Sequence, residues 1–272
     1  MRKNWPLPLS VIVFLLLSFA GEAQQKSYES QVSYQKGQQL ATIWALPYPE
    51  DVVESSIKDY MSRKGLKPSN SRGYMVFRNV RLEDTATSLN DLHIRVDRKS
   101  SKEKDASVVT VLVARPGEDP SARMGRDDLA QRRTATYVEN MLPGIQAGDL
   151  ETRIKSQESV TKKSQNKLGD LHDDQGDLEK KIKNTQADID KNKQDQVTET
   201  TIMQQNIHGD DAAMKKSHKK MDKLLSDQTS LQKKLAKYQA QLEQNKKDQG
   251  TQQSDALQQQ HSLDSLRSMR KN

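Results

Sequence analysis

Residues 168–189 read LGDLHDDQGDLEKKIKNTQADI, and this stretch decides how the second half of the chain folds. Its large apolar side chains are Leu168, Leu171, Leu178, Ile182 and Ile189. With Gln175 and Thr185 counted in the same series, the intervals alternate between three and four residues. Such a spacing places the side chains in one narrow stripe along a helix and predicts a coiled-coil seam. Because isolated helices this polar are marginal in water, the seam requires a partner helix.

A second seam follows in the sequence. Its apolar members are Met214, Met221, Leu224, Leu231, Leu235, Tyr238 and Leu242. Polar residues fill the remaining positions of the two seams: Asn192 in the first, and Ser217, Gln228 and Asn245 in the second. The two seams are out of register with each other. The change falls at residues 206–211, whose sequence NIHGDD has the chemistry of a turn.

Two architectures fit these seams. In one, the chain folds back at 206–211 into an antiparallel helical hairpin with arms of roughly 90 Å, at 1.5 Å per residue. In the other, one continuous helix with a stutter pairs in parallel with a second copy. We prefer the hairpin, because the two arms match in length and the turn chemistry lies between them.

The proline distribution separates this helical region from the rest of the chain. All eight prolines lie at or before Pro143. Proline costs about 3 kcal/mol inside a helix, so the long proline-free region that follows is typical of helix. We therefore expect a small folded domain at 36–143 and a coiled coil at 144–272. The hydrophobic content of 33% is too low for a single globule of this length.

The domain at 36–143 is expected to be α+β. We expect strands at 40–46, 74–78, 92–96 and 108–113, a helix from Pro49 to Met61, and a last helix that starts at Ser121 or Asp127 and ends at Met141. Successive strands with short connections indicate a small antiparallel sheet with helices on one face. Trp44 and Tyr48 are interpreted as core residues.

Two segments in this domain support a family resemblance. They read LPYPEDVV at 46–53 and RKSSKEKD at 98–105. With the element order, they resemble the small TATA-binding-protein-like α+β modules of uncharacterised exported proteins from Bacteroidota. The resemblance covers about 110 residues. It implies the fold and an exported protein, and it brings no known activity and no functional residue.

The N-terminus predicts export. Arg2 and Lys3 precede an apolar run at 9–20, and small residues favour cleavage after Ala23, as in a secretory signal peptide. We expect residues 1–23 to be removed, 24–35 to be a flexible segment, and the product to be soluble in the periplasm or cell envelope. The apolar run is too short to span a bilayer, so no transmembrane segment is expected after cleavage. The chain has no cysteine, which excludes disulfides and thiol catalysis.

No established catalytic pattern is found in the sequence. There is no glycine-rich phosphate loop after a strand and no nucleophile elbow. Of the five histidines only His93 lies in the small domain, where it is interpreted as an exposed residue on the polar face of a strand. His172 and His208 have acidic neighbours but no established metal-ligand spacing. We therefore expect no enzyme, no cofactor and no metal site.

The formal net charge is +7, spread over a dense mixture of both signs. Two basic clusters are candidate contacts for an anionic envelope surface: Lys215, Lys216, Lys219 and Lys220, and Arg98, Lys99 and Lys102. Each cluster also has an ordinary explanation. The first can be a solvated helix face, and the second can protect a sheet edge from aggregation. The pattern does not indicate nucleic-acid binding, for which positive charge is normally clustered.

Three non-catalytic functions remain open at this stage, beside an enzyme in the small domain, for which a deep pocket lined by converging polar groups would be the evidence. The first is a non-catalytic structural or protein-interaction protein of the cell envelope, an adaptor or spacer that acts through self-association or a protein partner at the coiled coil. The second is a periplasmic holdase with the general plan of the Skp chaperones, which have a small body and long helical arms; here the body lies almost wholly before the coil. The third is a binder of anionic envelope surfaces.

Overall fold

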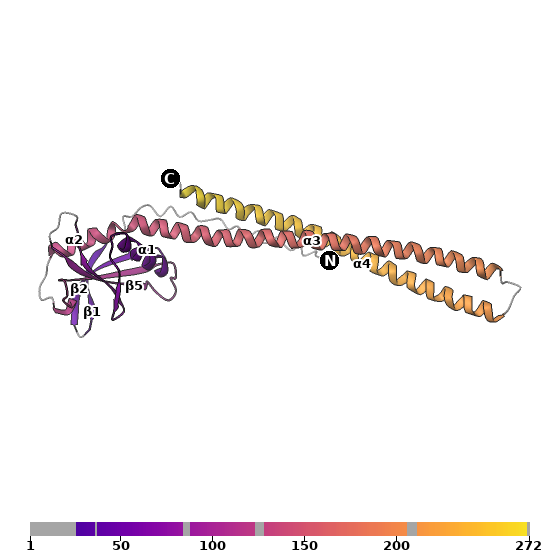
Figure 1. Ribbon diagram of the computed structural model, residues 1–272, viewed down its shortest axis with the longest axis horizontal. Helices are drawn as coiled ribbons and strands as arrows, with labels where there is room; N and C mark the ends of the chain where they lie inside the picture. Colours follow the sequence, from indigo (N-terminus) through magenta and orange to yellow (C-terminus); the bar gives the residue numbers. More distant parts are fainter. Residues whose placement is uncertain (1–25, 36, 84–87, 123–127, 206–210, 271–272) are drawn as a thin grey trace, which may run out of the picture. The chain divides into compact units, whose positions relative to one another are not determined.

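The computed structural model describes residues 26–35, 37–83, 88–122, 128–205 and 211–270. It divides into two compact units, Met1–Asp149 and Leu150–Asn272, which are described separately (Figure 1). The expected signal peptide at 1–23 and all of the expected turn at 206–211 except Asp211, which begins a helix, lie outside the described residues.

The first unit contains a six-stranded antiparallel sheet. Its strands are β1 (Tyr28–Tyr34), β2 (Gly37–Leu46), β3 (Ser69–Ser71), β4 (Tyr74–Val80), β5 (Asn90–Arg98) and β6 (Ser107–Ala114). They lie in the order β1-β2-β6-β5-β4-β3, and every neighbouring pair is antiparallel. The predicted fold class, an α+β domain with an antiparallel sheet, is confirmed.

The helices are α1 (Glu50–Arg63), α2 (Asp128–Glu139), α3 (Leu142–Gln205) and α4 (Asp211–Met269), with a 3₁₀ turn η1 at Pro120–Ala122. Helix α1 starts directly after Pro49 and carries Glu50 and Asp51 in its first turn, where carboxylates interact favourably with the helix dipole. Soon after it ends, Gly65 adopts a φ of 77°, in the left-handed region that suits a residue without a side chain.

The larger of two apolar clusters lies on one face of the sheet. Trp44 of β2 and Phe77 of β4 are fully buried there, and Ile57 of α1 and Val138 of α2 belong to the same apolar cluster. Both helices therefore cover this face, as predicted, and the assignment of Trp44 to the core is confirmed. Tyr48 is half-buried against the same cluster.

The expectation of a flexible segment at 24–35 is wrong for residues 28–34, which form β1 at the edge of the sheet. Strand β1 pairs with the first seven residues of β2, from Tyr28 opposite Ile43 to Tyr34 opposite Gly37. Its sequence YESQVSY has little apolar periodicity, so the pairing depends on the neighbouring strand and not on a strong strand pattern of its own. The three-residue strand β3 was also missed.

The last helix of the domain, expected to end at Met141, is followed almost at once by another helix. Helix α2 ends at Glu139, and α3 already begins at Leu142. Proline is tolerated in the first helical turn because the N–H that it lacks would have no partner there. Pro143 therefore opens a helix, and α3 contributes Ile145 to the core of the first unit before continuing into the second.

Candidate interaction site in the helical hairpin

Helices α3 and α4 of the second unit lie side by side and antiparallel (Figure 1). Near the start of α3, the Gln157 amide donates to the side chain of Gln259, 2.7 Å away near the end of α4. Farther along α3, the Asn192 amide donates to the Leu224 carbonyl at 3.2 Å, near the start of α4. The direction of the pairing is that of the hairpin, which was the preferred of the two predicted architectures.

The predicted apolar seam residues lie in the contact between the two helices. Ile189 is buried, and the other ten are half-buried: Leu168, Leu171, Leu178, Ile182, Met214, Met221, Leu224, Leu231, Leu235 and Leu242. Polar residues of the same series are buried in this contact as well. Those less than 9% exposed are Thr185, Asn192, Ser217 and Asn245. Each arm therefore supplies the partner helix that the seam of the other arm requires.

The observed seam is longer and more polar than the two seams predicted from the sequence. Thr161, Glu199 and Gln252 are buried, and Ser164, Gln196 and Gln249 are half-buried in the same stripe. These residues were missed because they lie beyond the ends of the two predicted seams, where no large apolar side chain marks the pattern. Extending the intervals of three and four through polar residues in both directions would have found them.

Two clusters of side-chain amides cross the seam. In the first, Asn245 and Gln249 of α4 both donate to the main-chain carbonyl of Leu171, each at 3.1 Å. The Gln249 amide nitrogen also lies 2.8 Å from Oε1 of Gln175 on α3 and 2.7 Å from Oδ1 of Asn245. Because these buried groups bond across the interface, the polar layer does not leave unsatisfied amides.

The second cluster repeats this arrangement with the two arms exchanged. Asn192 of α3 donates to the Leu224 carbonyl, and the Gln196 amide lies 2.8 Å from Oε1 of Gln228 on α4. Gln196 also donates to Oδ1 of Asn192 at 2.6 Å. Between the two clusters, Leu178, Ile182 and Ile189 on α3 and their counterparts on α4 form the apolar part of the seam. Buried amides of this kind fix the register of a coiled coil at some cost in stability.

Only one member of the lysine cluster at 215–220 makes an ion pair with a described residue. Nζ of Lys220 lies 2.6 Å from Oε2 of Glu199, whose side chain is 4% exposed. The hydrogen bonds from Lys220 and Ser217 lower the pKa of Glu199, and Glu199 in turn raises the pKa of Lys220. The remaining candidates Lys215, Lys216 and Lys219 are exposed on the outside of α4.

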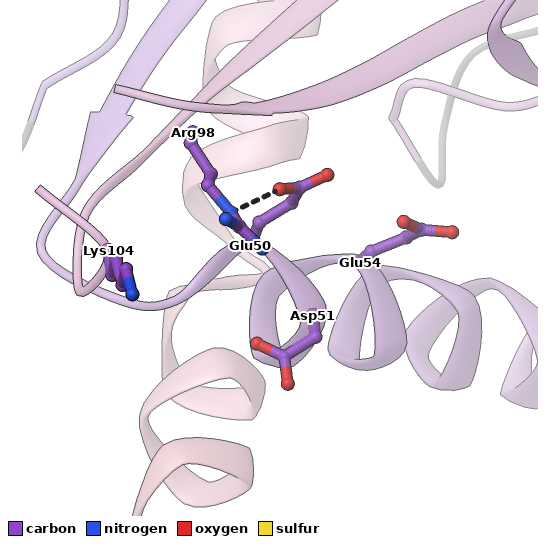
Figure 2. A pocket seen from close by; sticks show the side chains of 5 residues that line it. All are labelled: Glu50, Asp51, Glu54, Arg98 and Lys104. Carbon is purple, nitrogen blue, oxygen red and sulfur yellow. Dashed lines mark hydrogen bonds and ion pairs between the residues drawn. The ribbon is translucent and has the colours of Figure 1, made fainter. Parts of the chain in front are cut away.

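The second basic cluster is partly neutralised by carboxylates. Figure 2 shows the Arg98 side chain directed toward Glu50 at the start of α1, and their charged atoms lie 3.1 Å apart. Together with Asp51, Glu54 and Lys104, this pair lines an open hollow of about 240 Å³. Lys99 forms an ion pair with Glu103 at 3.4 Å, and Lys102 is exposed. The hollow therefore holds charges of both signs and is not a purely cationic surface.

His93 is buried, so the interpretation of this residue as exposed is wrong. It is 6% exposed, because the sheet curls and brings β1 over the face opposite the helices. The Tyr34 ring lies edge-on to His93 at 6.4 Å and to Tyr74 at 5.6 Å. Strands β1 and β4 are four places apart in the sheet, about 19 Å if it were flat at a spacing near 4.8 Å. Burial lowers the pKa of His93.

Asp119 connects the residue that follows β1 with the residue that follows β3. It accepts hydrogen bonds from Gln35 after β1 at 2.9 Å and from Arg72 after β3 at 2.8 Å. Gln35 and Arg72 both have a φ of 55°, which is an uncommon conformation for residues other than glycine. Burial favours the neutral form of Asp119, but the hydrogen bonds from Ser121 and Gln35 and the charge of Arg72 outweigh it and lower the pKa of this carboxyl.

The rings of Tyr34, Tyr74 and His93, on the face opposite the helices, form mainly a packing contact. Nδ1 of His93 and the Tyr74 hydroxyl are buried without a hydrogen-bond partner among the described residues. Within the same described part of the chain, no three His, Asp or Glu side chains lie close enough together to hold a metal ion. None of the described helices contains a stretch long and apolar enough to cross a bilayer.

No protein-family model matches this chain, and no curated protein matches it.

Proposed function

We propose that this protein is a non-catalytic structural or interaction protein of the cell envelope, in which the α3–α4 hairpin is the arm and the sheet domain is the docking module. The observation that carries the proposal is the seam itself, in which each arm covers the apolar stripe of the other and two amide clusters cross the contact. A paired arm of this kind suits a spacer of fixed length, because its register is specified at two separate places.

The arm supports a spacer or adaptor better than a chaperone that grips clients. A holdase requires exposed apolar surface for unfolded chains. In the described hairpin the large apolar side chains that are exposed are Val160, Val197, Leu225, Leu257 and Met269, and the two on α3 are 37 positions apart. The leucines of the seam pack against the opposite arm and are therefore not available to a client.

Export to the envelope is part of the proposal and rests on the N-terminal sequence. Expression of the full chain in a bacterial host, followed by fractionation and mass determination, tests it. We expect the chain in the envelope or periplasmic fraction, with a mass that corresponds to removal of about 23 residues. An unprocessed chain in the cytoplasm would contradict this part.

The interaction role is tested by photo-crosslinking in cells. A photoreactive residue replaces one exposed side chain at a time, at Lys183 on the hairpin or at Lys58 on the sheet domain, in the otherwise intact chain. We expect the same crosslinked partner in repeated experiments from at least one of the two sites. As the matched control, a photoreactive residue at buried Trp44 should give none. Failure of both exposed sites to crosslink would contradict the role.

A client-aggregation assay separates the holdase from the spacer. The full chain is added in equal amounts to an unfolded outer-membrane protein and light scattering is followed. We expect no suppression of aggregation. Suppression at stoichiometric amounts would favour the holdase function over the proposed one.

A further inference from the structure

The two arms of the hairpin contain the same sequence twice. Residues 162–196 of α3 and 215–249 of α4 align without gaps at a constant separation of 53 positions, and 16 of the 35 aligned residues are identical. The segments read KKSQNKLGDLHDDQGDLEKKIKNTQADIDKNKQDQ and KKSHKKMDKLLSDQTSLQKKLAKYQAQLEQNKKDQ. A shared composition would not align the same polar residue at the same seam position, so the two arms are copies of one unit.

The amide clusters show that the repeat is also structural. Asn192 and Gln196 are the α3 copies of Asn245 and Gln249, and Gln175 is the α3 copy of Gln228. The bonds follow the same correspondence. Each asparagine donates to a leucine carbonyl of the opposite arm, Asn192 to Leu224 and Asn245 to Leu171.

A third pair of positions repeats with one substitution. Gln252 of α4 donates to Ser164 of α3 at 2.6 Å. The copies of these residues in the other arm are Glu199 and Ser217, whose hydrogen bond contributes to the lowered pKa of Glu199. The hairpin is therefore nearly symmetric about an axis midway between the two amide clusters.

Symmetry of this kind makes each arm complementary to itself. If α3 of a second copy replaced α4, Gln175 of that copy would take the place of Gln228 and face Gln196. Leu171 would take the place of Leu224 and offer its carbonyl to Asn192. Lys167 of the second copy would take the place of Lys220 opposite Glu199. The polar groups at these repeated positions would find the same kind of partner as within one chain.

We infer that the partner for which the seam is suited is a second copy of this chain, and that either arm of one copy pairs antiparallel with either arm of the other. This inference rests on the proposed interaction role and identifies the partner at the coiled coil. Pairing within one chain is favoured at low concentration, because the connection between the arms gives an effective concentration in the millimolar range. Pairing between copies therefore rises with protein concentration.

The absence of cysteine makes a direct test available. Full-length chains with one introduced cysteine are mixed in pairs at about 100 μM, near enough to the effective concentration for exchange to compete. Each mixture is unfolded, refolded together and oxidised. The pair Gln196→Cys with Gln228→Cys reports contact between α3 and the α4 of another copy. Gln196→Cys with Gln175→Cys reports contact between two α3 arms, and Gln196→Cys with Lys180→Cys, on the outer face, is the matched control.

We expect covalent heterodimers in the first two mixtures, at least tenfold above the control. Heterodimers in the first mixture alone, or in neither, would overturn the inference. Circular dichroism of each variant before oxidation identifies any that has failed to fold, and for such a pair Asn192→Cys with Gln228→Cys, or Asn192→Cys with Gln175→Cys, is substituted. The readout requires no other envelope component, so its failure is distinguishable from failure of the photo-crosslinking that tests the proposed function.

Discussion

Gly148 in the second turn of α3 lies against Ser56 of α1, so closely that a Cβ atom added to Gly148 would overlap the Ser56 hydroxyl. Ser56 is itself buried, at 8% exposed. Glycine at this position therefore allows the start of α3 to approach α1 within the first unit. Gly176, in contrast, lies in the open part of the same helix, where a Cβ would meet nothing within 4 Å.

This contrast predicts opposite effects of one substitution. Gly176→Ala should stabilise the hairpin by about 0.5–1 kcal/mol, because alanine is the better helix former. Gly148→Ala should give no gain or a loss of about 1 kcal/mol from overpacking. Urea unfolding followed by circular dichroism and Trp44 fluorescence measures both. Adding Ser56→Ala to Gly148→Ala should restore part of the loss; equal gains from both glycine substitutions would contradict this packing.

Asp119→Asn should destabilise the sheet domain at neutral pH. The pKa of Asp119 is lowered on folding, so its carboxylate contributes stability above the ordinary value of 3.8 and loses it as the pH falls. Because the side chain is 38% exposed, we expect only about 1 kcal/mol or less. Urea unfolding at pH 7 and pH 3 should show a smaller difference between wild type and variant at the lower pH. A difference that grows at pH 3 would contradict the assignment.

His93 predicts a second pH dependence with the same sign. Its pKa is lowered on folding by burial, so below the ordinary value of 6.5 the unfolded chain binds the proton more readily and stability falls as the pH is lowered. Asp119 and Asp91 oppose this shift, and Arg78 and Arg72 support it. Thermal unfolding between pH 7.5 and 5, followed by Trp44 fluorescence, should show the loss. His93→Leu should flatten the profile, and His172→Leu on exposed helix should leave it unchanged.

Asn192→Leu and Asn245→Leu should each raise the melting temperature of the hairpin while weakening its register. The leucine removes a buried amide whose net contribution is small, and apolar burial of about 1 kcal/mol replaces it. Thermal melting by circular dichroism at 222 nm measures the first effect. Broader crosslinking between non-facing cysteines measures the second. A lower melting temperature in both variants would show that the amides contribute more to stability than to register.

The main helices and strands could be predicted from the sequence because strong local patterns determine them. The proline-free region and the intervals of three and four indicate long paired helices, and alternation at Leu92, Ile94 and Val96 indicates a strand with one buried face. Such patterns arise wherever one face of an element packs in an apolar core.

The parts that were missed depend on contacts between distant segments. Strand β1 forms because β2 offers an edge, and His93 is buried because the curled sheet brings Tyr34 across it. Neither effect leaves a periodic signal near the residue concerned. The polar seam did leave such a signal, the 53-residue repeat, but it appears only when the sequence is compared with itself.

The measurement that tests this architecture most directly is disulfide formation between Gln196→Cys and Gln228→Cys in one chain, in dilute protein purified without unfolding. The Gln196 amide nitrogen and the Gln228 amide oxygen lie 2.8 Å apart in the antiparallel pair. The double variant should oxidise rapidly within the monomer, and Gln196→Cys alone should form no covalent dimer. Efficient dimerisation of the single Gln196→Cys variant would place two α3 helices parallel and contradict the hairpin.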